Sequence, residues 1–477
     1  MSDDIGLRPR SGQSGSHSGG AAPPGFIRRL LENPARLLLA ALVAVSLYGA
    51  WNYSLSMPGI DYYVAWVTAD VAKNGRADKI YTRLGRYDLT REYRQQALQQ
   101  DPSSRQAVAA RHVQFLGATA TPFLYWTVNL FSTGDYERDL RIWHVLSLLC
   151  LVGSVVLVGR LAGLTGTTIL AILLPVVVWM LPVQSDLRVG NVNSVQLGLL
   201  SLALLLQSRD ANSVLALAAG AMVSVTVLFK PNLAPVPVLL CGYWLLGGHY
   251  GRLMLGLVGM ALGALFALGV SSVFFGGISG WTHWLSTMGG FTDWNMPAGA
   301  GNFHALSLIG LDPGPVGRVL MALLLCGLAL AAMATRSWTA RRPSSAAAGW
   351  RSAFGPPSAS DYGLVLGIAC VIQMLVSPLV WLHYYVLILP LFVMALRPLS
   401  ASRGAGAAGL LMQRLLPLLA FLLLLDGPLA GLLDESPAAA VNKACVLSAA
   451  LLYLSGLWQL SRPPLEPVGN LAVQKEE

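Results

Sequence analysis

Residues 253–275 read LMLGLVGMALGALFALGVSSVFF, a run of 23 residues that contains no charged side chain. A helix that crosses a bilayer needs about 20 such residues. Gly259 and Gly263 in this run form a G-x-x-x-G pattern, which is more typical of close helix packing in membranes than of a ligand site. The stretch therefore predicts a membrane-spanning helix.

Similar apolar runs recur along all 477 residues. Hydrophobic residues make up 55% of the chain and charged residues 12%, with a mean hydropathy of +0.58, whereas soluble domains contain about 25% charged residues. We therefore predict an all-α polytopic membrane protein with about twelve transmembrane helices. The expected spans are residues 34–50, 140–159, 166–183, 192–207, 213–229, 233–247, 253–275, 317–335, 362–378, 384–396, 409–426 and 439–460.

Composition also excludes several classes of protein. The low charge rules out a disordered or nucleic-acid-binding chain, although the net charge is +9 and the pI is near 9.4. The five cysteines all lie in apolar runs and form no C-x-x-C pair, so zinc ribbons and disulfide frameworks have no support. No nucleotide-binding loop and no H-E-x-x-H motif is present. We therefore expect neither a metal nor another cofactor.

The domain organisation follows from the same composition. Gly, Ser and Pro dominate the start of the chain, which predicts a disordered tail. Residues 51–137 are much more polar than the rest, with helix-compatible stretches from Asp61 to Asn74 and from Tyr87 to Gln100, and they indicate surface helices. The predicted parts are a cytoplasmic tail 1–30, a transmembrane domain 31–462 with a long outer loop 51–137 and a basic cytoplasmic linker 336–361, and a cytoplasmic tail 463–477.

The positive-inside rule fixes the expected orientation. If residues 113–131 do not cross the membrane, 17 Lys and Arg lie inside and 4 lie in the short outer loops. If they do cross, the counts become 11 and 12 and the bias disappears. We therefore predict that residues 113–131 form a re-entrant or surface helix and that both termini are cytoplasmic.

This topology brings polar groups from separate helix ends to the outer face. They are Asp61, Arg188, Asn191, Asn193, Lys230, Trp281, His283, Trp284, Trp294, Asn302, His304 and His383. Ionisable groups at membrane depth are costly and mark functional sites by default. Each also has a simpler interpretation: Asp61 as a helix cap, Lys230 as a snorkelling side chain, Arg188 as a loop charge, the histidines as packing residues and the tryptophans as an interfacial belt.

The order of these motifs resembles glycosyltransferase family 87, the polyprenol-phosphate-mannose-dependent mannosyltransferases of the GT-C superfamily. The resemblance runs from Asp61 to about Tyr385, and the sequence departs from the family pattern at Thr121, Asn191, Val380 and Tyr384. The segments that carry it are Asp61-Tyr62-Tyr63, Gly75, Tyr81, Thr121-Pro122, Gly190-Asn191-Val192-Asn193, Lys230-Pro231, Gly301-Asn302 and Ser377-Pro378-Leu379-Val380-Trp381-Leu382-His383-Tyr384.

The resemblance implies an inverting, metal-independent hexosyltransferase in the bacterial inner membrane. It would transfer a sugar, mannose in the family, from a polyprenyl phosphate to a glycan or glycolipid acceptor, with its active site facing the periplasm. Asp61 would be the catalytic base, and Lys230, His383 and Arg188 would bind the donor phosphate. The expected lining residues are Tyr62, Tyr63, Asn191, Asn193, Asn302, His304, Trp381 and Tyr384.

Two other classes stay open at this stage. Twelve spans with both termini inside is also a common layout of secondary transporters, although no internal repeat is visible and the polar groups gather at helix ends. A lipid-handling membrane protein without catalysis would not need Asp61. Sugar transfer in the wild-type protein distinguishes the enzyme from both alternatives.

Overall fold

The computed structural model describes most of the chain, and all regular structure in the described residues is helical. An isolated bridge between Met180 and Leu425 is the one β-type pairing among them. The predicted site residues Asn302 and His304 lie outside the described residues, as do both predicted tails and most of the predicted linker. The described residues are 33–209, 213–289, 305, 314–340, 358–377, 379–397, 407–425 and 437–462.

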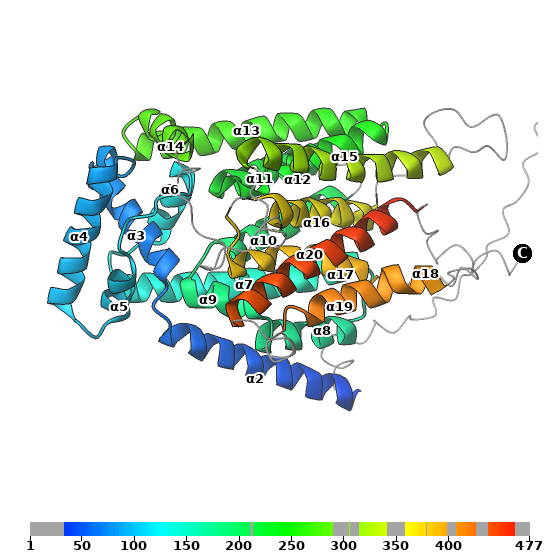
Figure 1. The fold of residues 1–477 in the computed structure, drawn as a ribbon, viewed down its shortest axis with the longest axis horizontal. Helices are drawn as coiled ribbons and strands as arrows, with labels where there is room; N and C mark the ends of the chain where they lie inside the picture. Colours follow the sequence, from blue (N-terminus) through cyan, green and yellow to red (C-terminus); the bar gives the residue numbers. More distant parts are fainter. Residues whose placement is uncertain are drawn as a thin grey trace, which may run out of the picture.

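Apolar helices form a bundle whose axes run side by side (Figure 1). The bundle helices are α2 (Pro34–Ser56), α7 (Tyr136–Leu161), α8 (Gly166–Val178), α9 (Leu181–Val189), α10 (Asn193–Ser208), α11 (Ser213–Phe229), η2 (Pro231–Leu233), α12 (Pro235–Leu246), α13 (Tyr250–Phe274), α15 (Gly314–Ala340), α16 (Ala359–Val376), η6 (Leu382–Ile388), α17 (Leu389–Ala395), α18 (Ala407–Leu410), η7 (Leu411–Leu415), α19 (Leu416–Leu422) and α20 (Pro437–Leu460).

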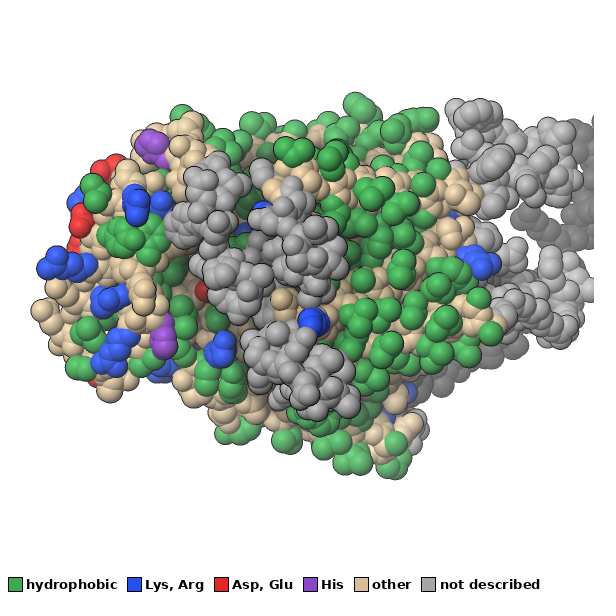
Figure 2. All heavy atoms as spheres, in the orientation of Figure 1, with side chains coloured by type: hydrophobic (Ala, Val, Ile, Leu, Met, Phe, Trp, Pro, Cys, Tyr) green, Lys and Arg blue, Asp and Glu red, His purple; other side chains and the backbone are tan. Residues whose placement is uncertain are grey.

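Helices occupy all twelve predicted spans, and the chain is an all-α polytopic membrane protein. Six of the described helices are long and apolar enough to cross a bilayer, and α9 with α10, bent by 113°, would make a seventh. The other five apolar helical segments are only 10–17 residues long. The number of twelve crossings therefore stays a prediction. Hydrophobic side chains cover the bundle surface, as a membrane-embedded surface requires (Figure 2).

Local sequence explains where these helices begin and how closely they pack. The side chains of Asn33, Asp135 and Ser358 accept hydrogen bonds from the first turns of α2, α7 and α16. The prediction for the G-x-x-x-G pattern is confirmed, because a Cβ atom at Gly259 would lie 2.2 Å from the Leu217 carbonyl oxygen of α11. Gly259 thus lets α13 approach the backbone of α11.

A polar lobe covers one end of the bundle, and we use this name for residues 57–135 together with α14. The prediction of helices at Asp61–Asn74 and Tyr87–Gln100 is confirmed to within a few residues by α3 and α4. Charged side chains gather on this lobe, at the left of Figure 2. Its helices are α3 (Ile60–Lys73), η1 (Ala77–Lys79), α4 (Arg83–Gln100), α5 (Arg105–His112), α6 (Pro122–Phe131) and α14 (Ser279–Gly289).

Residues 113–131 contain the short helix α6, which packs against α3 and α13. Ten helical residues extend about 15 Å, which is half the thickness of a bilayer core. Thr121, just before α6, donates a hydrogen bond to the carbonyl oxygen of Leu228 near the end of α11. The lobe is therefore attached to the bundle next to Lys230.

Candidate active site

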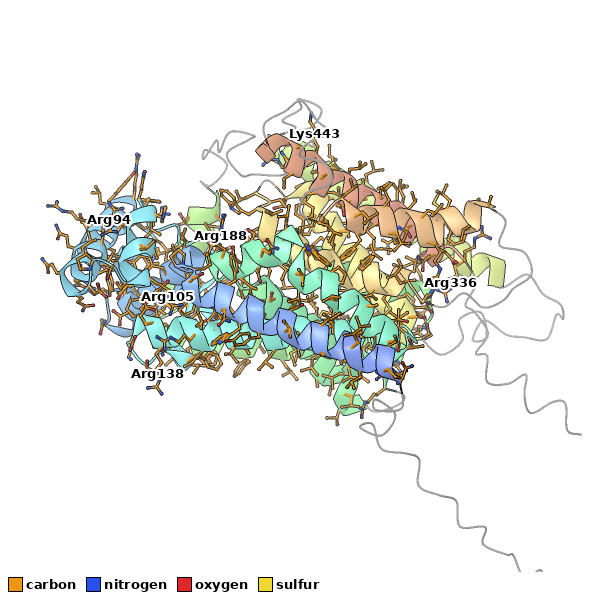
Figure 3. The ribbon with its side chains drawn as sticks, turned by 90° about the horizontal axis from the view of Figure 1, so that it is seen from below. Arg94, Arg105, Arg138, Arg188, Arg336 and Lys443 are labelled. Carbon is orange, nitrogen blue, oxygen red and sulfur yellow. The ribbon has the colours of Figure 1, made fainter. Side chains whose placement is uncertain are left out.

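Four chain segments meet where the lobe joins the bundle. They are the start of α3 with Asp61, the bend between α9 and α10 with Asn191, the turn after α11 with Lys230, and the start of η6 with His383. Figure 3 shows Arg188, at the end of α9, in the same region. Residues that are far apart in the sequence thus lie together at one end of the bundle.

Two glycines allow the first two segments to approach. Gly59 and Gly190 both have φ near +66°, a conformation that side-chain-bearing residues rarely adopt. A Cβ atom at Gly190 would lie 2.9 Å from the Tyr62 Cβ, so a larger residue there would push α3 away. The amide of Gly59 donates to the Arg188 carbonyl oxygen at 3.3 Å. Backbone contacts therefore fix Asp61 relative to the α9–α10 bend.

Asp61 lies in the first turn of α3 but does not cap the helix. The N-cap residue is Gly59, so the interpretation of Asp61 as a cap is wrong. Its Oδ2 accepts a hydrogen bond from Asn191 Nδ2 at 2.6 Å and lies 3.4 Å from His383 Nε2. The carboxylate retains 39% of its side-chain exposure, which leaves room for a substrate to reach it.

The hydrogen bonds of Asn191 define the protonation of His383. Asn191 Oδ1 accepts from the Val192 amide at 2.7 Å, which fixes the orientation of the side-chain amide. Asn191 Nδ2 then faces both Asp61 Oδ2 and His383 Nε2, the latter at 3.1 Å. An amide nitrogen can only donate. His383 Nε2 therefore accepts, and the ring is neutral with its proton on Nδ1.

Lys230 is held by an aromatic neighbour rather than by a carboxylate. Its Nζ lies 3.9 Å from the centroid of the Tyr384 ring and donates to the Tyr384 hydroxyl. Cation–π contacts of this kind attract an ammonium group to the face of an aromatic ring. Among the described residues, no carboxylate lies within ion-pair distance of Lys230, although its charge interacts with that of Asp61.

Burial changes the acidity of both charged groups. Although the Asp61 side chain is 39% exposed, surrounding protein atoms desolvate its carboxyl and raise its pKa above the ordinary value, and the Asn191 hydrogen bond and the Lys230 charge partly oppose this. Desolvation lowers the pKa of Lys230 to about 8, against the opposing charges of Asp61 and Asp186. A carboxylate with a raised pKa is a stronger proton acceptor, and the lysine is still mostly cationic at pH 7.

Comparison with known proteins identifies the family. The model of glycosyltransferase family 87 matches residues 119–355, which is about half of the chain. The chain belongs to glycosyltransferase family 87. No curated protein and no solved structure matches it. The protein is therefore a membrane glycosyltransferase, with a sugar donor and an acceptor as substrates.

The matched region of this glycosyltransferase contains Asn191 and Lys230, whereas Asp61 precedes it and His383 follows it. In the fold, both residues contact the matched region, because Asn191 Nδ2 lies 2.6 Å from Asp61 Oδ2 and 3.1 Å from His383 Nε2. In the described residues, no group of three His, Cys, Asp or Glu side chains is close enough together to hold a metal ion.

Several predicted lining residues of the glycosyltransferase lie apart from this group. Tyr62 and Tyr63 are each 2% exposed, and their rings pack against Tyr136 at the start of α7. Trp281 and Trp284 of α14 are also buried, and their indole nitrogens donate to Ser271 of α13 and to the backbone of Thr119 in the lobe. These tryptophans thus connect α14 to the bundle and to the rest of the lobe.

The remaining predicted residues are at the edge of the group. Arg188 is exposed on the last turn of α9, and Trp381 is half-buried directly before η6. Asn193 is fully buried, and its Nδ2 donates to the His383 carbonyl oxygen at 3.2 Å. Asn193 thus holds the backbone of His383 in place without being exposed to a substrate.

Sequence reasoning missed two buried residues near this group. Gln196 Nε2 lies 3.1 Å from the Thr226 carbonyl oxygen and 3.4 Å from that of Lys230, so it supports the turn that carries the lysine. Asp186 accepts hydrogen bonds from Asn193 and Ser194. The signal for Asp186 was present as an acidic residue in an apolar stretch, four positions before the glycine of the bend.

Proposed function

We propose that this enzyme transfers mannose from a polyprenyl-phosphate donor to a lipid-linked or glycan acceptor, with inversion at the anomeric carbon. The observation that carries the proposal is the partly exposed Asp61 carboxylate, which lies beside a neutral His383 and interacts with the charge of Lys230. A base and a cation placed together suit a displacement in which a hydroxyl loses a proton and a phosphate leaves.

In the proposed reaction, Asp61 takes the proton of an acceptor hydroxyl. The acceptor oxygen attacks the anomeric carbon of the sugar, and the bond from that carbon to the phosphate oxygen breaks. The released polyprenyl phosphate carries the electron pair of this bond, and the Lys230 ammonium, with Arg188 further out, stabilises its charge. This single displacement inverts the anomeric configuration and needs no metal ion or nucleotide.

His383 has a second role in this proposal. Once Asp61 holds the proton, its O–H can donate to His383 Nε2, which is 3.4 Å away, in place of the hydrogen bond that Asn191 Nδ2 donates to this nitrogen. Proton transfer would make the imidazole cationic as the phosphate leaves. The sequence-based prediction that His383 binds the phosphate therefore requires that the ring first gains this proton.

The test is sugar transfer by the purified protein in detergent. A synthetic polyprenyl phosphate mannose is the donor, GDP-mannose is the control donor, and the product is identified by mass spectrometry. The proposal predicts transfer from the lipid donor alone. Transfer from GDP-mannose alone, or none from either donor in a folded protein, would contradict it; the second result would favour a transporter or a lipid-handling protein.

We also propose that the lobe and the active site face the periplasm of a bacterial inner membrane. The support is the excess of Lys and Arg in the opposite set of loops, 17 against 4. Arg111 is exposed on the lobe, and Thr165 is exposed at the other end of the bundle. Cysteine at residue 111 should react with an impermeant thiol reagent in intact spheroplasts, and cysteine at residue 165 only after lysis. The reverse result would invert the orientation.

A further inference from the structure

The inner side of the bend between α9 and α10 is held by one buried residue, Asp186. Its side chain is 2% exposed. Oδ1 accepts from Asn193 Nδ2 at 3.0 Å, and Oδ2 accepts from the Ser194 hydroxyl at 2.5 Å and the Ser194 amide at 3.3 Å. Its backbone carbonyl oxygen accepts from the amides of Gly190 and Asn191 at 2.9 and 3.3 Å. Five donors from residues 190–194 thus converge on Asp186.

We propose that Asp186 is a positioning residue of the transfer reaction, which places Asn191 and His383 correctly around Asp61. The connection to His383 runs through Asn193, whose Nδ2 donates both to Asp186 Oδ1 and to the His383 carbonyl oxygen at 3.2 Å. The connection to Asn191 is the bend itself. Asp186 forms no hydrogen bond with Asp61, although its charge acts on Asp61 and Lys230, so the contacts that position Asn191 and His383 run through these two neighbours. The proposal rests on the proposed function.

Packing around the bend explains why a small displacement of residues 190–194 would change the surroundings of Asp61. Trp143 on α7 donates to the carbonyl oxygens of Gly190 and Asn191 at 3.0 and 3.3 Å, so the outer side of the bend is fixed. Gly190 lies against Tyr62 of α3. A bend that loses its support from Asp186 would therefore change the geometry at Asn191. A misplacement of about 1 Å can lower a rate about 100-fold.

The substitution Asp186→Asn tests the carboxylate with little change in volume. An asparagine offers one acceptor oxygen to donors that now occupy two oxygens. If that oxygen keeps both bonds from Ser194, the new amide nitrogen faces the donor Asn193 Nδ2. Asn193 must then turn, and its hydrogen bond to the His383 carbonyl oxygen is lost. The variant therefore breaks the link to His383, and it also removes the charge that Asp186 presents to Asp61 and Lys230, which Asn193→Ala leaves in place.

The experiment combines kinetics with an NMR spectrum of the whole protein labelled with ¹⁵N in its histidine rings. A His383→Gln spectrum assigns the signal of His383. In the wild type, this signal should show an unprotonated Nε2 and a proton on Nδ1. In Asp186→Asn, we expect that the His383 ring no longer occupies only this tautomer. We also expect kcat to fall by about 10- to 100-fold with an unchanged KM for the donor. An Asp186→Asn protein with wild-type kcat and a wild-type His383 signal would overturn the proposal.

Asp139 provides a matched control. It is also a fully buried carboxylate, and it accepts from Trp66 Nε1, the Ser132 hydroxyl, and the amide and hydroxyl of Thr133 at 2.7–3.0 Å. Asp139→Asn should lower the melting temperature as much as Asp186→Asn does, without changing the His383 signal. An equal change of that signal in both variants would show a general loss of packing and contradict a specific role.

A second variant keeps the test valid if Asp186→Asn does not fold. Asn193→Ala removes the link between Asp186 and His383 directly, and it should cause the same change of the His383 signal. Where both single variants fold, the double variant should show the same kcat and the same change of the His383 signal as either single variant. A wild-type His383 signal in Asn193→Ala would overturn the proposal. Because the spectrum needs no substrate, it also separates this result from a failure of the proposed function, which would appear as absent sugar transfer by the wild type.

Discussion

The bundle buries charged groups at both of its ends, and their surroundings differ. At the end far from the lobe, Arg336 and Asp361 form a bidentate ion pair with N–O distances of 2.7 and 2.8 Å, and each side chain is 7% exposed. At the lobe end, Asp61 bonds to the neutral Asn191 and Lys230 lies on the ring of Tyr384. Figure 3 shows Arg336 and Arg188 near these opposite ends.

This difference distinguishes charged residues that stabilise the fold from charged residues that can interact with a substrate. Arg336 and Asp361 satisfy each other, so neither offers a charge to a ligand, and their pair connects α15 with α16. Asp61 and Lys230 are partly desolvated and interact without forming a direct ion pair, a state that costs free energy and marks candidate substrate sites. A substrate phosphate and an acceptor hydroxyl are the groups that would complete this one.

The largest expected effect is on the base. Asp61→Asn keeps the size and the hydrogen-bonding geometry of the side chain but removes its ability to take a proton. We expect sugar transfer to fall by about 10²- to 10⁴-fold, with an unchanged melting temperature. Asp70→Asn on the same helix is the control and should stay within about twofold of the wild type, since the Asp70 carboxylate accepts hydrogen bonds from Tyr93 and Asn74 of the lobe. An active Asp61→Asn enzyme would remove Asp61 as the base.

The next effect is expected at the Arg336–Asp361 ion pair, where substitution should lower the stability of the protein. Asp361→Ala removes the carboxylate that pairs with the buried Arg336, and breaking a buried pair in this way typically costs about 3–5 kcal/mol. The melting temperature should therefore drop, while kcat per folded molecule stays near wild type. The double variant Arg336→Met, Asp361→Leu should recover most of the stability, because buried pairs can be replaced by apolar groups. A loss of kcat without a loss of stability would show that this end takes part in the reaction.

The third effect is on the donor. Lys230→Ala removes a charge-assisted contact worth about 1.5–3 kcal/mol, so KM for the polyprenyl phosphate donor should rise about 10- to 150-fold. Arg188→Ala should have a smaller effect, because this side chain is exposed and more screened. Both values come from initial rates at varied donor concentration. Wild-type KM in Lys230→Ala would contradict the assignment of Lys230 to the phosphate.

The helices and the ionisable residues of the site could be predicted from the sequence, whereas the residues that support the site could not. Apolar runs indicate helices directly, and Asp61, Lys230 and His383 are ionisable groups at helix ends. Tyr62 and Tyr63 seemed to line the site because they follow Asp61. However, successive helical residues point about 100° apart, so all three cannot face one site. The role of Asp186 depends on a bend of 113° that brings residues 190–194 around it, and no periodicity of the sequence specifies that angle.

The smallest effect is the pH dependence, and it tests whether the lobe-end charges act as assigned. Asp61 must be ionised to take a proton, so kcat/KM should fall as the pH drops through its raised pKa. Lys230 must be cationic, so kcat/KM should also fall as the pH rises through about 8. One pH unit above that value, about one tenth of the lysine stays charged, and a fall of up to about tenfold is expected. Lys230→Arg replaces it with a group that stays protonated.

The pH profile of Lys230→Arg should therefore keep its acidic limb and lose its alkaline limb. The substitution Arg336→Lys, at the other end of the bundle, is the control and should leave both limbs in place, because that pair does not meet the substrate. The comparison needs kcat/KM at half-unit steps from about pH 5 to pH 10, with stability measured at each step. An alkaline limb that persists in Lys230→Arg would assign it to another group, and the charge that stabilises the leaving phosphate would then have to come from elsewhere in the site.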